Sequence, residues 1–389
     1  MLHYFDYAAT TPVLPEVADT VYRTLTESFG NPSSRYPLGQ EAAARVKADR
    51  AAVAAALGCE ASEIIFTSCG TEGNNWAIRA AVELNRRKGK HIVTTALEHS
   101  AVLEPIRELE AQGYEVTRLQ PDKTGHISMD DVRAALRSDT VLVSMMLVNN
   151  ELGVTLPVAE TAKAIKAAGC PALLHCDAVQ GFLKVPFTPK ALGVDFLSIS
   201  GHKIGAPKGI GALYINQKLL SKNPDAQAHK IKGMLLGGGQ EGKLRSGTEP
   251  TAQIAGFAEA CRIGKANTSA NREAVTAIKE RTLAALKEAL PELEIISDGD
   301  APHICAVTLP GYKAENIVRV LGDMGVCISS GSACHKGKPS HVFAALNLPR
   351  PWLDGTLRIS FSPAVTDEDI TALVNALVHA RDTLFQTMS

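Results

Sequence analysis

The sequence lacks the features of several protein classes. Its 389 residues carry 40 Lys and Arg against 41 Asp and Glu, so the basic excess of a typical nucleic-acid-binding protein is absent. Apolar runs such as residues 140–148 fall far short of the roughly 20 residues that a membrane-spanning helix needs. Residues 1–13 lack the basic start and apolar stretch of a secretory signal. We therefore expect a cytoplasmic protein with a small-molecule substrate and no membrane or nucleic-acid partner.

Cysteine is present but without a pattern. The eight cysteines include no Cys-x-x-Cys pair, which argues against a zinc finger and a disulfide framework. We expect most of them to be small buried side chains. A zinc site of Cys334, His335 and His341 would have three ligands in a basic loop and no fourth, so we expect no metal.

The apolar pattern predicts an α/β fold with two domains. Short apolar runs alternate with segments of helical period, which is typical of a mostly parallel sheet covered by helices. Seven strands are expected at 64–67, 91–95, 115–119, 141–147, 172–176, 196–200 and 211–215. Clear helices are expected at 38–57, 71–87, 101–112, 129–137 and 158–168.

A smaller α+β domain is expected after the sheet. A helical stretch runs from residue 251 to 290, with an interruption at 263–271, and short strands follow near 294–296, 305–309, 326–329 and 357–361. We expect residues 15–255 to form the large domain, and residues 1–14 and 256–389 to form the small one.

Two strand ends offer sites for an anion and a cation. In residues 66–75 a strand ends in small residues and a helix begins near Gly70 and Thr71, so free backbone N–H groups could bind a phosphate. A tight turn with Thr71 as helix cap explains the same residues. Asp177 ends another expected strand, where it could pair with a cofactor nitrogen or cap the next helix.

A third strand end carries the best candidate for a reactive lysine. Lys203 follows residues 195–200 in a glycine-rich loop with Ser200 and His202, among small residues that let a planar ring approach. These are the requirements of a Schiff-base lysine. Lys208 lies further into the loop and is better explained as a solvated surface residue.

Three other residues stand out. Cys334 lies in a Ser/Gly loop followed by His335, Lys336 and Lys338, and positive charge with loop exposure favours a reactive thiolate. Arg358, in an alternating strand, is either a clamp for a substrate carboxylate or an exposed edge-strand arginine. His99 could stack on a planar cofactor or cap a helix.

Together these segments resemble the cysteine desulfurases, the class V branch of the fold-type I enzymes that use pyridoxal 5'-phosphate (PLP). The similarity extends over almost the whole chain. It is carried by residues 4–12, 30–34, 149–153, 200–203, 245–250 and 330–334, in family order and spacing.

The resemblance implies roles for individual residues. Lys203 would hold PLP as a Schiff base, Asp177 would pair with the pyridine nitrogen, and His99 would stack on the ring. Phosphate binding would fall to Gly70, Thr71, Ser200 and His202. The remaining implied contacts are Gln180 to the ring hydroxyl, Asn150 near cofactor and substrate, and Asn31 and Arg358 to the substrate carboxylate.

The resemblance also implies a reaction and partners. L-cysteine would replace Lys203 on the cofactor, Lys203 would move the α-proton, and Cys334 would take the sulfur as a persulfide and release L-alanine. Thr248 matches a residue that reaches the phosphate of the partner subunit, which implies a homodimer. The sulfur would then pass to an acceptor protein, for iron-sulfur clusters, tRNA thiolation or another sulfur pathway.

The sequence departs from the family pattern in ways that affect the site and the acceptor. Cys69 stands in the phosphate turn, and Tyr36 replaces a histidine found in several members. The loop after Cys334 is shorter than in housekeeping members, and the chain ends without the tail with which those members dock an iron-sulfur scaffold. The sequence leaves a selenocysteine lyase and a noncatalytic PLP-binding scaffold as alternatives.

Overall fold

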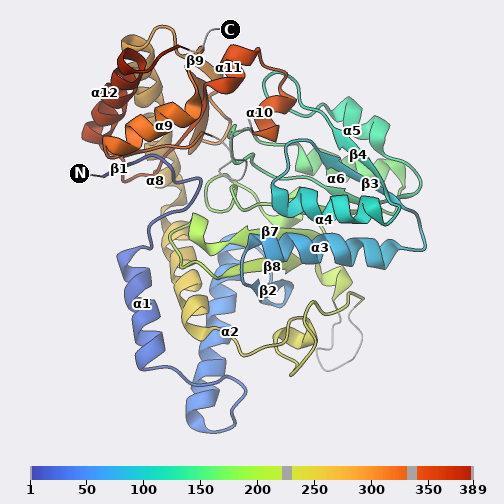
Figure 1. Ribbon diagram of the computed structural model, residues 1–389. Coiled ribbons are helices and arrows are strands. Elements are labelled where there is room, and N and C mark those ends of the chain that lie inside the picture. The colour runs from blue at the N-terminus through green and yellow to red at the C-terminus, as the bar shows by residue number, and fades with distance from the viewer. Residues whose placement is uncertain (1, 221–229, 331–339, 387–389) are drawn as a thin grey trace.

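A computed structural model describes residues 2–220, 230–330 and 340–386. Its main sheet has seven strands in the order β2-β8-β7-β6-β5-β3-β4 (Figure 1). Strand β8 is antiparallel to both neighbours, and the other pairs are parallel. The expected α/β fold with a mostly parallel seven-stranded sheet is confirmed. The strands are β2 (Ile64–Thr67), β3 (His91–Thr95), β4 (Glu115–Leu119), β5 (Thr140–Ser144), β6 (Leu173–Asp177), β7 (Phe196–Ser200) and β8 (Gly211–Ile215).

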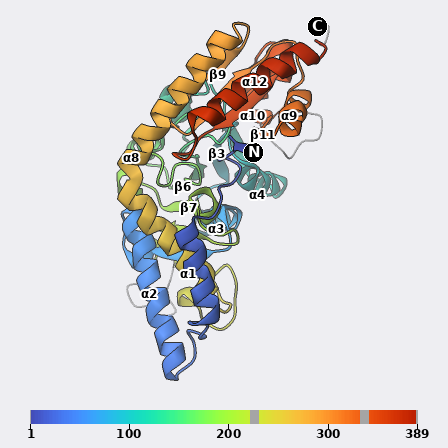
Figure 2. The same cartoon turned by 90° about the vertical axis from the view of Figure 1, so that its left-hand side faces the viewer.

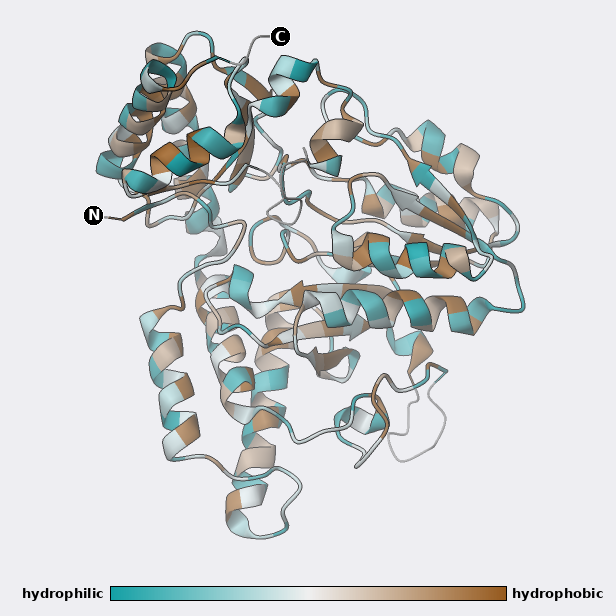
Figure 3. Ribbon diagram, in the orientation of Figure 1, coloured by the Kyte–Doolittle hydropathy of each residue, from teal (hydrophilic) through white to brown (hydrophobic). Residues whose placement is uncertain are grey.

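Helices cover both faces of this sheet, because successive strand residues point to opposite faces and both sets are apolar. Ile92 and Leu142 belong to one hydrophobic cluster, whereas the adjacent Val93 and Val143 belong to another. The helices around this sheet alternate between hydrophilic and hydrophobic residues along their length (Figure 3). They include α2 (Pro37–Leu57), α3 (Gly70–Asn85), α4 (Ser100–Ala111), α5 (Met129–Ala135), α6 (Val158–Ala168) and α7 (Pro189–Leu192).

The carboxyl-terminal part forms a smaller layer of its own. An antiparallel sheet has the order β12-β10-β9, and β1 (His3–Tyr4) pairs in parallel with β11 (Val326–Cys327). The bounds are β9 (Glu294–Ser297), β10 (Ile304–Thr308), β12 (Thr356–Ser360), α9 (Ala314–Asp323), α10 (His341–Ala345), α11 (Arg350–Asp354) and α12 (Asp367–Thr383). The amino terminus therefore joins the carboxyl-terminal layer before the chain enters α1 (Pro15–Thr26).

The expected helix interruption at residues 263–271 is wrong. Helix α8 (Thr251–Ala289) is continuous and packs against α1 and α2 (Figure 2). Its polar residues are accommodated because their side chains bond to the preceding turn: Asn267 Nδ2 donates to the Ile263 carbonyl and Thr268 Oγ1 to that of Gly264. Gly264 also lets Leu183 approach closely, since a Cβ there would lie 2.6 Å from the leucine Cδ1.

Helix α8 joins the two layers. Phe257 and Cys261 in its first half belong to the core of the main sheet, whereas Ile278 and Leu286 belong to the core of the small sheet. The two cores support a division into a large and a small domain. The boundary at residue 255 remains a prediction, because residue 255 lies within α8.

Seven cysteines lie in the described part of the chain, and all are free. Cys176, Cys261 and Cys305 are buried, and the other four are partly buried. None of the helices described is both long and apolar enough to span a bilayer. Within residues 2–220, 230–330 and 340–386, no three His, Cys, Asp or Glu side chains are grouped as a metal site would require.

Candidate active site

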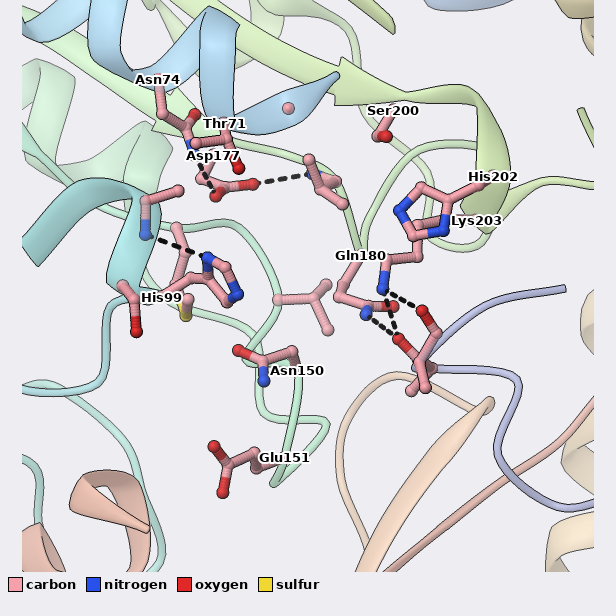
Figure 4. Close-up of a pocket in the computed structure, with 18 of the residues that line it drawn as sticks. Thr71, Asn74, His99, Asn150, Glu151, Asp177, Gln180, Ser200, His202 and Lys203 are labelled. Carbon is pink, nitrogen blue, oxygen red and sulfur yellow. Dashed lines mark hydrogen bonds between the residues drawn. The ribbon is translucent and has the colours of Figure 1, made fainter. Parts of the chain in front are cut away.

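A pocket of about 310 Å³ lies beyond the carboxyl ends of β2, β3, β6 and β7. Ligands of open α/β sheets bind at this edge. The pocket brings together ten of the residues proposed from sequence, several of which are labelled in Figure 4. They are Gly70, Thr71, His99, Asn150, Asp177, Gln180, Ser200, His202, Lys203 and Arg358.

Lys203 follows β7 in a short 3-10 turn, Gly201–Lys203. Its ammonium donates to the backbone carbonyls of Ala8 at 2.7 Å and Ala9 at 2.8 Å. Burial, and then the charge of Arg358, lower the pKa of Lys203 from 10.5 to about 8. The neutral, nucleophilic amine is therefore accessible at mildly alkaline pH, as Schiff-base chemistry requires.

Asp177 is the buried carboxylate of the pocket, with 6% of its surface exposed. Its Oδ2 accepts from Asn74 Nδ2 at 2.6 Å, and its Oδ1 accepts from the backbone N–H of Val179 at 3.0 Å. The second bond closes a local turn, and no helix begins here for Asp177 to cap, because the next helix is α7. A carboxylate has about four lone-pair positions, so these two bonds leave capacity for a further donor.

His99 lies across the pocket from Lys203 and Gln180 (Figure 4). Its Nδ1 accepts from the backbone N–H of Ala101 at 3.1 Å, so the residue does cap α4 while its ring lines the pocket. Burial lowers the pKa of His99. A neutral ring with its proton on Nε2 is therefore favoured.

One end of the pocket lies at the start of α3. Cys69, Gly70 and Thr71 line it, and the helix has no side-chain cap, so its first N–H groups are available to an anion. Ser200 Oγ is buried without a hydrogen-bond partner among the described residues. His202 Nδ1 lies 3.2 Å from Thr10 Oγ1, and burial lowers the pKa of His202 to about 4.

Arg358 lies on edge strand β12, as one reading expected, but it is 5% exposed. The expectation of an exposed side chain is therefore wrong. Its Nη2 pairs with Asp6 Oδ1 at 2.7 Å, and its Nη1 donates to the Asn150 carbonyl at 2.9 Å. The Nε has no partner among the described residues, and a guanidinium held in this way can take a carboxylate.

Three of the proposed residues are not seen in the pocket. Asn31 and Thr248 are exposed and do not line it. Cys334 lies outside the described residues. Ser329 and His341, which stand on either side of residues 331–339 in sequence, both line the pocket. Described residues on both sides of Cys334 in sequence therefore lie at this site.

The residues present fit PLP. Gln180 Oε1, Asn74 Oδ1 and Ser200 Oγ are buried polar atoms without a partner in the described chain, which is costly unless a ligand supplies one. Gly70 keeps the cradle open, because a Cβ there would lie 2.7 Å from Val179 Cγ2. The pocket is also within the usual size range of small-molecule sites.

Sequence reasoning missed several contributors. Asn74 orients Asp177, and Asp6, Ala8 and Ala9 hold the two cationic side chains. Glu98 is fully buried beside His99, and burial raises its pKa to about 8. Asn74 stands in the quoted 66–75 motif and could have been found one helical turn after Gly70, but no sequence signal marks the two alanine carbonyls.

Comparisons with known proteins agree on one family. A family model described as Aminotransferase class-V matches residues 3–373. A "Cysteine desulfurase" of Trichormus azollae is 39% identical over 378 residues, which cover 96% of this chain and 91% of that one. A "Cysteine desulfurase IscS" of Methanosarcina thermophila is 38% identical over 380 residues, covering 96% and 90%.

Solved structures give the same result. A "NIFS-LIKE PROTEIN" superposes with a TM-score of 0.90 at 31% identity, covering 99% of this chain and 100% of that one. A structure titled "SspA in complex with cysteine" superposes with a TM-score of 0.79 at 33% identity, covering 94% and 100%. The family match and these whole-chain similarities show that the chain belongs to the class V aminotransferase family.

Proposed function

We propose that this chain is a PLP-dependent cysteine desulfurase, which converts L-cysteine to L-alanine and holds the sulfur as a persulfide on Cys334. One observation carries the proposal. Lys203, Asp177 and His99 converge on a pocket whose lining includes Ser329 and His341, the described residues near both ends of the Cys334 segment. An aminotransferase would need the first three residues but would have no use for a reactive cysteine between Ser329 and His341 in sequence.

The cofactor would be held at three points. Lys203 would form the Schiff base, Asp177 would keep the pyridine nitrogen protonated, and Gly70, Thr71, Ser200 and His202 would bind the phosphate. His99 would lie on the ring face and Gln180 would contact the ring hydroxyl. The bound cofactor supplies an electron sink for the substrate carbon, and this is the chemistry that the protein side chains lack.

Arg358 and Asn150 would orient the substrate. The Nε of Arg358 is buried without a partner among the described residues, so a substrate carboxylate there would give it an acceptor. Once L-cysteine displaces it, Lys203 is a free amine, and its pKa of about 8 lets it take and return the α-proton.

Cys334 would perform the sulfur transfer. Its thiolate attacks the substrate sulfur, the bond between that sulfur and the substrate Cβ breaks, and Cβ gains a proton as L-alanine forms. His335, Lys336 and Lys338 follow Cys334 in sequence, and nearby positive charge favours the thiolate.

The partners and the location follow from the same proposal. Thr248 is exposed on a segment fixed by the Arg245 to Glu72 ion pair, so it would complete the phosphate site of a second copy in a homodimer. Asn31, also exposed, would reach a substrate only in such an assembly. We further propose a cytoplasmic location, since free cysteines suit a reducing compartment, and a sulfur-acceptor protein as the final partner.

Mass spectrometry of the protein after L-cysteine, without reductant, tests the proposal. We expect one added sulfur, which peptide mapping locates on Cys334, and none in Cys334→Ser. Cys327→Ser is the matched control because Cys327 is a partly buried cysteine of the same region. An unmodified Cys334 in a PLP-loaded protein would refute the proposal, and faster turnover of L-selenocysteine with negligible desulfuration would identify a selenocysteine lyase.

A further inference from the structure

A second cavity, of about 470 Å³, lies on the other side of Lys203. It is bounded by α8, by the amino-terminal segment 7–15 and by residues 361–364 after β12. Figure 2 shows α8 passing α1 on its way to the small sheet. Lys203 lines both this cavity and the candidate active site, so the two are separated by little more than that side chain and the amino-terminal segment.

The charged side chains of the cavity have one sign. Lys184, Lys203 and Arg272 line it, and no Asp or Glu appears among its lining residues. Neither Lys184 nor Arg272 forms an ion pair within the described chain. A partly buried lysine normally has a carboxylate partner. The positive field of this cavity is therefore uncompensated.

A buried polar group, His303, also lines this cavity. His303 is 4% exposed, and neither of its ring nitrogens makes a hydrogen bond of ordinary geometry among the described residues. The backbone carbonyl of Gln180 lies near enough to favour the protonated ring, but burial and the charge of Lys184 hold the pKa of His303 well below its usual value. A neutral imidazole with an open nitrogen can donate a hydrogen bond to an anion.

Much of the rest of the wall is apolar, although Thr11, Asn267, Asn271 and Ser362 also line it. Val13, Leu14, Leu183 and Phe361 are among the side chains that line it, together with several prolines. The cavity is also within the usual size range of small-molecule sites. An occupant must therefore combine an apolar body with a single anionic group at the Lys184 end.

We propose that this cavity is a second binding site, which takes a small amphiphilic carboxylate whose anionic group pairs with Lys184 and His303. The site is separate from the proposed desulfurase chemistry and does not depend on it. The pKa of Lys184 supports the assignment: burial, and then the charges of Lys203 and Arg358, lower it to about 7. A bound carboxylate offsets that repulsion and returns the proton.

Binding here would reach the reactive lysine through the amino-terminal segment. Tyr7 and residues 11–15 face the second cavity, whereas Ala8 and Ala9 line the candidate active site and accept from Lys203. A ligand that packs against one side of this segment therefore contacts the chain that lines the candidate active site on its other side. The cavity is placed to work as an effector site.

Calorimetry of the PLP-loaded protein with phenylbutyrate tests the proposal. Because burial lowers the pKa of Lys184, binding at pH 8 should be accompanied by proton uptake, which appears as a dependence of the heat on the buffer. At pH 6 the lysine is already charged and the uptake should vanish. The neutral analogue phenylbutanol should bind about tenfold more weakly, because it cannot make the charge-assisted contact.

Two variants locate the ligand. Lys184→Met should weaken phenylbutyrate about tenfold and abolish the proton uptake, while leaving phenylbutanol unchanged. Lys208→Met is the matched control, since Lys208 is exposed and lines neither cavity. Saturating L-alanine, which would compete at Arg358, should not displace phenylbutyrate.

Each contrary outcome is distinct. Equal binding of phenylbutyrate by the Lys184→Met and unaltered proteins would overturn the proposal, as would the absence of any binding heat. Displacement by L-alanine, or loss of binding in Arg358→Lys but not in Lys184→Met, would place the ligand in the candidate active site instead. These results stand whether or not the protein releases sulfide from L-cysteine.

Discussion

Replacement of Lys203 by methionine should favour the folded state of the cofactor-free protein more near neutral pH than at high pH. The native state holds this lysine with a pKa of about 8 instead of 10.5, mainly because it is buried. Below pH 8 the native state therefore holds a desolvated charge at Lys203, whereas the unfolded chain holds a solvated one. The protein accepts this cost to obtain a reactive amine.

The magnitude follows from the two pKa values. Between about pH 8 and 10.5 the unfolded state binds more protons than the native state, so native stability rises with pH in that window. At about 1.36 kcal/mol per unit, the wild type should gain roughly 2.5 kcal/mol relative to the variant between pH 7 and pH 10, or about 2 after allowance for partial exposure.

Two further contributions are smaller. The loss of the bonds to the carbonyls of Ala8 and Ala9 should cost about 1 kcal/mol each, and the cost at Ala8 is reduced because its carbonyl also accepts from Gln180 Nε2. Removal of the Lys203 charge also raises the pKa of Lys184, which it now lowers, and this adds to the gain at neutral pH.

Urea unfolding of both proteins at pH 7 and pH 10 measures the difference. The double difference reports Lys203 together with its effect on Lys184, since most other groups titrate alike in the two chains. Lys208→Met, an exposed lysine of the same loop, should give the same stability change at both pH values. A double difference for Lys203→Met that is indistinguishable from this control would refute the argument that the lysine is held in a depressed state.

Other changes probe the surroundings of the pocket. Asn74→Ala removes the 2.6 Å bond to the Asp177 carboxylate and should cost about 1–3 kcal/mol in urea unfolding, with faster loss of PLP on dialysis. Glu98→Gln should remove a fall in stability between about pH 5 and 8, since the raised pKa makes the native state bind more protons than the unfolded state there. Arg358→Lys keeps a charge near Asp6 but loses the second donor to a carboxylate, so KM for L-cysteine should rise about tenfold with a smaller change in kcat.

Matched variants distinguish these effects from general damage. Asn75→Ala alters the neighbouring amide, which bonds to the Thr71 carbonyl instead of to Asp177, and should retain PLP. Glu104→Gln and Arg107→Lys alter an exposed ion pair and should change neither the pH dependence of stability nor KM. A KM for Arg358→Lys equal to that of Arg107→Lys would contradict the carboxylate role.

Most of the sheet could be predicted because periodicity is a local property. The strands at 64–67 and 211–215 were expected with the bounds that β2 and β8 have, and β5 ends at Ser144, three residues before the expected limit. The continuity of α8 was not predictable in this way. Its polar residues look unfavourable in sequence, and only the contacts of Asn267 and Thr268 with the preceding turn explain why the helix continues.

The site residues could be predicted where their role depends on residue type. The prediction failed where their role depends on burial. Lys203 and Asp177 stand at strand ends, and sheet topology alone brings such positions together. Arg358 read equally well as an exposed edge residue, because a sequence does not reveal that Asp6, from the other end of the chain, covers it. The same applies to Lys184, which forms no ion pair with the carboxylates of the described residues, a fact that only the folded chain reveals.

Residues 6–11 should be altered with the same care as an active-site loop. Asp6 holds Arg358, Ala8 holds Gln180 and Lys203, and Thr10 and Thr11 bond to His202. An amino-terminal deletion, a proteolytic nick or a bulky tag that displaces this segment would disturb all of these side chains at once. Loss of activity after such a change would resemble damage to the reactive residues themselves, although none of them had been altered.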